Sequence, residues 1–205
     1  MKNTLFVIAG LLLLTVSSFA APVTIVFTAF QAPYQWQLGY PYTANVNGVP
    51  GVAVMCDDWE HGGVPGQTWQ ANFTDLGTGN LSQLRFNQLP NALTLYHEVG
   101  WLLLETLVTP QGQTWTDINS AVWYIFDTNA YMTPGSWYWF GQAQNEASAG
   151  FPGVNFSPVG IYTPVNQYDT NVDGPQELLR VVPEPSTLLL LAGGVVGAFV
   201  RKRWS

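Results

Sequence analysis

Lysine and arginine are nearly missing from the middle of this 205-residue chain. Between residues 21 and 185 the cations are Arg85 and Arg180 alone, against 13 aspartates and glutamates. A surface that follows nucleic-acid phosphates is therefore excluded, as are a P-loop lysine, a Schiff-base lysine and a Lys–Asn isopeptide crosslink. Charged residues make up only 9% of the chain and hydrophobic residues 47%, which indicates a folded domain rather than a disordered one.

Cysteine occurs once, at Cys56, so no disulfide can form within the chain. One interpretation is a small buried hydrophobic residue at the end of a strand. The other is a nucleophile served by His61 or His97, but the neighbouring Asp57 and Asp58 would raise the pKa of the thiol and disfavour the thiolate. The sequence therefore gives little support to a cysteine hydrolase.

The N-terminus has the pattern of a secretory signal peptide. Lys2 precedes an apolar run over residues 5–16, and Ser18 and Ala20 place small residues at −3 and −1 before Ala21. We predict that residues 1–20 are removed by signal peptidase. An uncleaved anchor is the alternative, but the run is shorter than the roughly 20 residues of a typical span.

The C-terminus has three ordered features. Val182-Pro183-Glu184-Pro185 is followed by an apolar stretch to residue 200 and then by the basic cluster Arg201, Lys202 and Arg203. The two prolines predict an extended segment. We expect a short membrane helix over 186–200, and the positive-inside rule places its basic end in the cytoplasm.

These C-terminal residues closely resemble the PEP-CTERM sorting signal, which is also known as the ice-binding protein C-terminal domain. The likeness covers about the last 24 residues and says nothing of ice binding by the rest of the chain. It implies recognition by an exosortase-type sorting enzyme, a transpeptidase, in the envelope of a Gram-negative bacterium that makes extracellular polysaccharide. The protein is then expected to be exported, and to be held at the membrane transiently or permanently.

Residues 21–182 are predicted to form one extracytoplasmic domain, and 183–205 the sorting signal. Helices are expected over 91–108, from 116 or 117 onward, and over 136–147; Glu98 falls on the polar face of the first. The predicted class is α+β: a β-rich domain with a central block of two or three helices, flanked by an N-terminal signal helix and a C-terminal membrane-anchor helix. Strand candidates are 23–28, 40–46, 49–56, 81–86 and 176–182.

Two segments of the middle resemble the thioester domains of bacterial surface adhesins. They are Val54-Met55-Cys56-Asp57-Asp58 and Ile118-Asn119-Ser120-Ala121-Val122-Trp123. In that family a cysteine and a glutamine form an internal thioester that reacts with surface amines. The resemblance pairs Cys56 with Asn119, whose side chain is one methylene shorter than the family's glutamine.

Residues 169–174 resemble part of a calcium-binding loop. Asp169, Asn171 and Asp173 stand at positions 1, 3 and 5, and Glu177 at position 9, but Arg180 replaces the usual glutamate at position 12. A loop stabilised by Asx turns is the alternative. Apart from this structural calcium ion we expect no cofactor.

No catalytic motif is complete, so we do not expect an enzyme. His97 and Glu98 begin a zinc-protease pattern, but Trp101 occupies the position of its second histidine. We expect a structural or adhesive protein of the cell envelope or extracellular matrix, with the membrane and a sorting enzyme as partners. The alternative is a carbohydrate-binding or glycan-processing domain that uses exposed aromatics such as Trp137 on extracellular polysaccharide.

Overall fold

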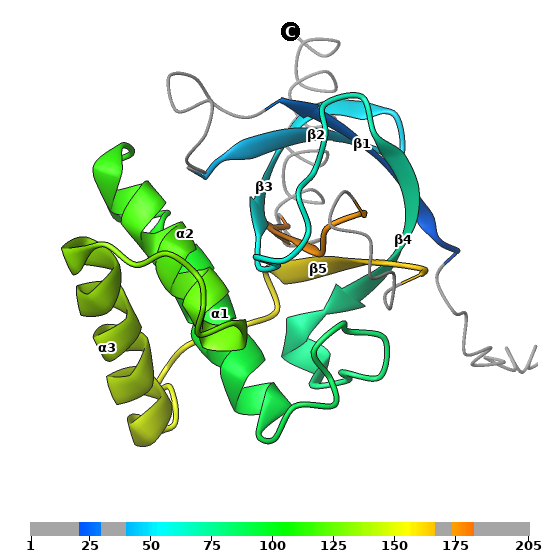
Figure 1. The fold of residues 1–205 in the computed structure, drawn as a ribbon. Helices are drawn as coiled ribbons and strands as arrows, with labels where there is room; N and C mark the ends of the chain where they lie inside the picture. The colour runs from blue at the N-terminus through cyan, green and yellow to red at the C-terminus, as the bar shows by residue number, and fades with distance from the viewer. Residues whose placement is uncertain (1–20, 30–39, 167–173, 183–205) are drawn as a thin grey trace, which may run out of the picture.

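A computed structural model describes residues 21–29, 40–166 and 174–182 of the chain. A small antiparallel barrel forms one half of the molecule, and three helices pack together on one side of it (Figure 1). The predicted signal helix and the predicted helix over 186–200 lie outside the described residues. Within those residues no helix has the length and apolar character needed to cross a membrane.

The six strands close into a barrel in the order β1-β2-β3-β6-β5-β4, and every neighbouring pair is antiparallel. Asn47 and Gly48, both at positive φ, make the tight turn between β2 and β3, as this dipeptide favours. The strands are β1 (Val23–Ala29), β2 (Tyr42–Val46), β3 (Val49–Cys56), β4 (Thr68–Asp75), β5 (Val159–Pro164) and β6 (Leu178–Val181).

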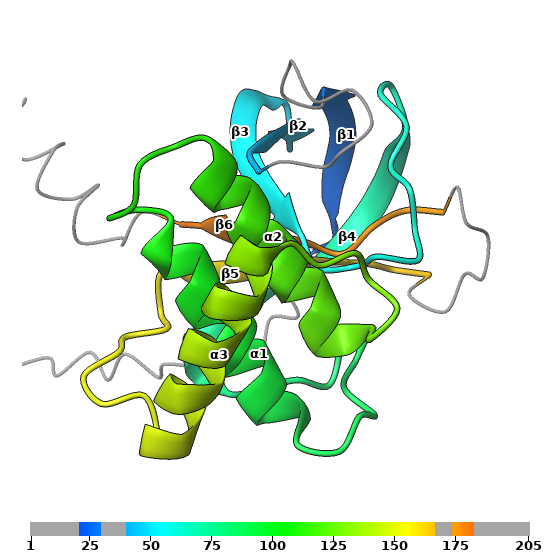
Figure 2. The ribbon, with the colours of Figure 1, turned by 60° about the vertical axis from the view of Figure 1, so that its left-hand side comes forward.

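The helices α1 (Ala92–Glu105), α2 (Gln113–Phe126) and α3 (Pro134–Ala149) lie between β4 and β5 in the chain. Helix α1 contacts β5 and β6, and α2 contacts β3. Figure 2 shows β5 and β6 behind the helical layer. Thr133 starts α3 with a capping box, in which its hydroxyl accepts from the N–H of Ser136 and the Ser136 hydroxyl accepts from the N–H of Thr133.

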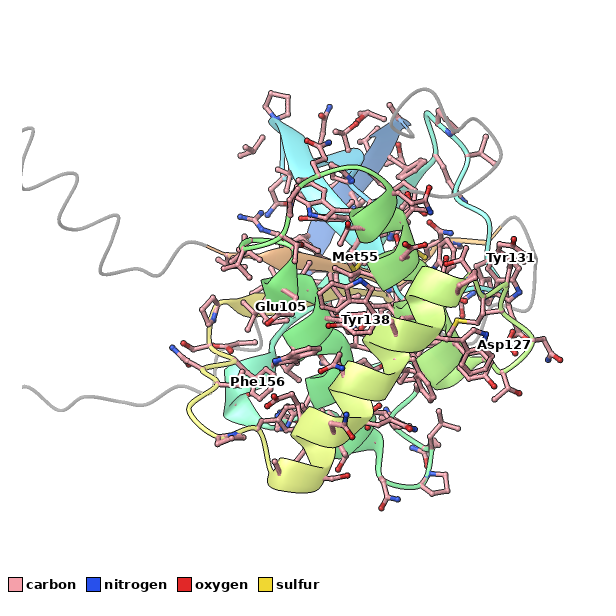
Figure 3. All side chains as sticks on the ribbon, turned by 90° about the vertical axis from the view of Figure 1, so that its left-hand side faces the viewer. Met55, Glu105, Asp127, Tyr131, Tyr138 and Phe156 are labelled. Carbon is pink, nitrogen blue, oxygen red and sulfur yellow. The ribbon has the colours of Figure 1, made fainter. Side chains whose placement is uncertain are left out.

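Successive side chains along a strand point to opposite faces of the sheet, and the apolar ones form two separate hydrophobic cores. In β3, Val54 and Cys56 point into the barrel, whereas Met55 lies between the barrel and the helices, as Figure 3 shows. In β6, Leu178 faces the barrel interior and Leu179 faces the helices. The helices and the barrel are therefore joined through one face of β3, β5 and β6.

The predicted fold class is wrong, because the sheet closes into a barrel. Strands β4 and β5 were not predicted, and these two strands join β1 to β6 and so close the barrel. The expected strand over 81–86 is a series of turns instead. The three expected helices are confirmed, with α2 starting a few residues earlier than predicted.

Candidate functional site

Cys56 and Asn119, paired by resemblance in the sequence, meet in the structure. Cys56 is the last residue of β3, and Asn119 lies in the middle of α2; both are fully buried. The Asn119 amide Nδ2 donates a hydrogen bond to the main-chain carbonyl of Cys56 at 2.8 Å. This contact ties α2 to the end of β3.

The thiol of Cys56 makes its own contacts with the main chain of Asp58. The N–H of Asp58 donates to Sγ at 3.3 Å, and Sγ donates to the carbonyl of Asp58 at 3.1 Å. Burial, followed by the negative charge of Asp57, raises the pKa of the Cys56 thiol well above its usual value. The thiolate is therefore disfavoured at neutral pH, and the sulfur is a weak nucleophile in this state.

A cluster of buried polar side chains lies beside Cys56. Glu177 is fully buried and its carboxylate has three donors: the Tyr96 hydroxyl at 2.6 Å, the N–H of Arg85 at 3.0 Å, and the Thr163 hydroxyl. Tyr96 comes from α1 and Thr163 from β5, while Glu177 precedes β6. Glu177 therefore joins a helix, a strand and a loop at one point.

Arg85 is buried and forms the cationic part of the cluster. Its Nη1 is paired with the carboxylate of Asp58, and its Nη2 donates to the carbonyl of Pro175 at 2.8 Å. His61 Nδ1 lies 2.9 Å from both Arg85 Nη1 and Asp58 Oδ1. Neutral His61 can accept from Arg85 there, and protonated His61 can donate to Asp58 instead.

Asp57 differs from the other acids of the cluster. It is fully buried, and among the described residues neither of its carboxyl oxygens has a hydrogen-bond partner. Burial first, and then the neighbouring Glu177, raise its pKa well above the usual value, although Arg85 acts in the opposite direction. Both effects favour the neutral acid over the carboxylate at Asp57.

The residues that complete this cluster were missed in the sequence. Arg85, Tyr96 and Thr163 belong to no motif and lie far from Glu177 in the chain. The one available signal was the scarcity of cations, because a lone arginine in a domain rich in acids needs a carboxylate partner when it is buried.

The other candidate residues lie apart from the cluster. The ring of His97 stacks on Phe156 with a centroid separation of 4.2 Å, and burial lowers its pKa. No group of three or more His, Cys, Asp and Glu side chains in the described parts of the chain is arranged to hold a metal ion. Asp169, Asn171 and Asp173 lie outside the described residues, so the predicted calcium loop stays a prediction.

Exposed aromatic side chains gather at α3 and the segment before it. Tyr131, Trp137 and Tyr138 have exposed fractions of 58%, 49% and 59%, and Figure 3 shows Tyr138 on α3 and Tyr131 on the connection from α2. Trp137 rests edge-on against Tyr124, with a centroid separation of 4.9 Å. Trp139 is half-buried beside Trp101, and Trp123 belongs to the core.

Comparison with known proteins identifies the tail. The PEP-CTERM protein-sorting motif matches residues 181–203, which confirms the resemblance seen in Val182-Pro183-Glu184-Pro185 and Arg201-Lys202-Arg203. Val181 and Val182 lie at the end of β6, and Pro183 onward lies outside the described residues. The motif implies an exported, envelope-associated protein that is processed by an exosortase-type enzyme.

Two solved streptococcal structures are similar to the domain. One is the N-terminal domain of the Streptococcus pyogenes pilus tip adhesin Cpa, at 10% identity and a TM-score of 0.48, covering 78% of this chain and 93% of that one. The other is the N-terminal thioester domain of the fibronectin-binding protein SfbI from Streptococcus pyogenes, at 10% identity and a TM-score of 0.47, covering 80% and 95%. Among curated proteins, none matches this chain in sequence.

Proposed function

We propose that this protein is a structural or adhesive component of the cell envelope or extracellular matrix, delivered by its signal peptide and sorted through its tail. The observation that carries the proposal is the sorting motif at residues 181–203. It begins on the last strand of the folded domain, so no linker separates the barrel from the start of the motif.

The end of the domain is compatible with processing of the tail. β6 ends at Val181, and the N–H of Val182 donates to the carbonyl of Pro158 at 2.6 Å. Among the described residues, the barrel pairings end at Val181. Removal of the chain beyond Val182 would therefore leave these pairings intact.

A non-enzymatic role is supported by the state of the candidate groups. Cys56, Asp57 and Glu177 are fully buried, and the thiol pKa is raised. Substrate would have no direct route to these side chains. The surface instead presents acids and exposed aromatics, since Arg85 is buried and Arg180 is half-buried, with its Nη1 donating to the Tyr162 hydroxyl.

Removal of residues 183–205 tests the sorting part of the proposal. We expect the shortened chain, with its signal peptide kept, to be released rather than retained in the envelope, and to show no second processing step. The full chain with Trp137→Ala is the matched control, because it keeps both signals. Unchanged fractionation and processing of the shortened chain would contradict the proposal.

The exposed aromatics favour a second candidate, a carbohydrate-binding surface for extracellular polysaccharide. Trp137 and Tyr138 have enough exposed ring area for stacking on sugars, and the lack of exposed Lys or Arg side chains within residues 21–29, 40–166 and 174–182 favours a neutral glycan. A glycan pull-down compares Trp137→Ala with Val165→Ala, an exposed apolar control after β5. Selective loss with Trp137→Ala supports binding at α3, and equal retention by both variants contradicts it.

A further inference from the structure

The barrel is closed by a short seam between β3 and β6. Only two residue pairs, Met55 with Leu179 and Cys56 with Leu178, join these strands. Each of the other five strand pairings contains four or five residue pairs. Closure of the barrel at this point therefore needs support beyond the strand ladder.

The register places two acids at the end of that seam. Because Cys56 is opposite Leu178 in an antiparallel pair, extending this register by one residue beyond the strand ends sets Asp57 against Glu177. Thr163 continues the same row on β5, since Tyr162 is opposite Leu178 there. Like charges directly opposite each other on a sheet destabilise the pairing.

The charges around these acids do not balance when all are ionised. Asp57, Asp58 and Glu177 supply three carboxylates, and Arg85, already paired with Asp58, supplies the guanidinium. Glu177 receives its three hydrogen bonds from other groups, while Asp57 has no donor. A buried carboxylate without a partner is costly, and a proton on Asp57 provides a donor towards Glu177.

We infer that Asp57 carries a proton and donates a hydrogen bond to Glu177, and that this acid pair closes the β3–β6 seam. Loss of the proton sets two carboxylates against each other at the shortest pairing of the barrel and opens it there. β6 is also the strand that carries the first residues of the sorting motif. The same proton therefore controls how firmly the start of the tail is held in the domain.

A phenol and a thiol also lie beside the pair. Burial raises the pKa of Tyr96 and of Cys56 well above their usual values, so the phenol and the thiol stay neutral. Asp58 and His61 face Arg85 on the other side of the cluster. Elsewhere in the chain, Glu98 has a pKa of about 7. Its titration would overlap with the measurement, so it is removed by the substitution Glu98→Gln.

The first test is urea unfolding of the full chain between pH 7 and 9 in a Glu98→Gln background. Retention of one proton by the folded state makes the unfolding equilibrium constant rise about tenfold per pH unit. Asp57→Asn places an amide donor against Glu177 and should remove this dependence of the unfolding equilibrium constant on pH. Glu60→Gln, which removes an exposed carboxylate nearby, should leave it intact. An unchanged slope in Asp57→Asn would overturn the inference.

The second test leaves Asp57 and Glu177 unsubstituted. Hydrogen exchange of the Glu98→Gln chain, corrected for the intrinsic effect of pH, compares β6 with the β1–β2 pairing. We expect the amides of β6 to lose protection at a lower pH than those of β1 and β2. If both regions lose protection together, proton loss does not act at the seam, and the inference fails even where Asp57→Asn does not fold.

Discussion

At the scale of single residues, Cys56 shows how burial and hydrogen bonding decide between alternative chemistries. The sequence allowed a buried thiol or a thioester with Asn119. In the structure the Asn119 amide donates to the carbonyl of Cys56, while Sγ contacts the main chain of Asp58. These contacts favour the free thiol, and the thioester stays a prediction.

We expect the purified chain to have the full mass of its sequence, with a thiol that alkylates slowly until the protein is denatured. The thiol is fully buried and its pKa is raised, so both access and thiolate formation limit the reaction. Intact mass spectrometry with and without alkylation measures this. A mass lower by one ammonia, together with an unreactive sulfur after denaturation, would establish the thioester instead.

Glu98 was expected on the polar face of its helix, but it is only 6% exposed. Burial raises its pKa to about 7. In the unfolded chain the pKa of Glu98 is lower, at 4.5. The contribution of Glu98 to the free energy of unfolding is therefore most favourable below about pH 4.5 and is lost as the pH rises towards 7.

Glu98→Gln should therefore stabilise the protein at pH 8 by about 1 to 3 kcal/mol, and change little near pH 4.5. Urea unfolding of the variant and the parent chain at the two pH values checks this. Glu60→Gln provides an exposed control at the same pH values. An equal effect of Glu98→Gln at both would show that the carboxyl is not desolvated.

At the scale of elements, the helices were easier to predict from the sequence than the strands. Helix α3 carries a local signal, Thr133 before Pro134, and was expected. β4 and β5 were missed, although apolar residues alternate with polar ones along β4, as is typical of a strand; in β5, Gly160 weakens the strand pattern. Gly160 is required there because an added Cβ would meet the ring of Phe73.

The cap of α3 also connects it to α2, since the Thr133 hydroxyl donates to Asp117 Oδ1 at 2.6 Å while it accepts from the N–H of Ser136. Thr133→Ala removes both contacts and should lower the free energy of unfolding by about 1 to 2 kcal/mol. Thr133→Ser keeps the hydroxyl and should stay within about 0.5 kcal/mol of the parent. Equal losses in the two variants would indicate that the methyl group, and not the cap, is responsible.

At the scale of the whole molecule, the contacts of Glu177 within the barrel make it unsuitable as a ligand in the predicted calcium loop. Its carboxylate is occupied by Tyr96, Arg85 and Thr163, and Arg180 at position 12 of the loop donates to Tyr162. These two positions are therefore taken by contacts within the barrel. Any calcium ligands would have to come from Asp169, Asn171 and Asp173.

We expect calcium added after chelation to shift the melting temperature by less than about 1 °C, because ligands at positions 9 and 12 are missing. A differential scan of the full chain with calcium, and with magnesium as the control, measures this. Calcium at about 100 times its dissociation constant would stabilise the protein by about 2.7 kcal/mol, so a specific rise of several degrees would establish the site.

The sequence alone determined the sorting motif and the three helices, because each depends on residues that are close in the chain: Val182-Pro183-Glu184-Pro185 with its basic cluster, and the helical periodicities, to which α3 adds a cap. Only the tertiary structure decided the barrel closure and the acid pair. Asp57 and Glu177 are 120 positions apart, and they become neighbours through the β3–β6 register. That register depends on burying Cys56, Met55, Leu178 and Leu179 together, which no local pattern specifies.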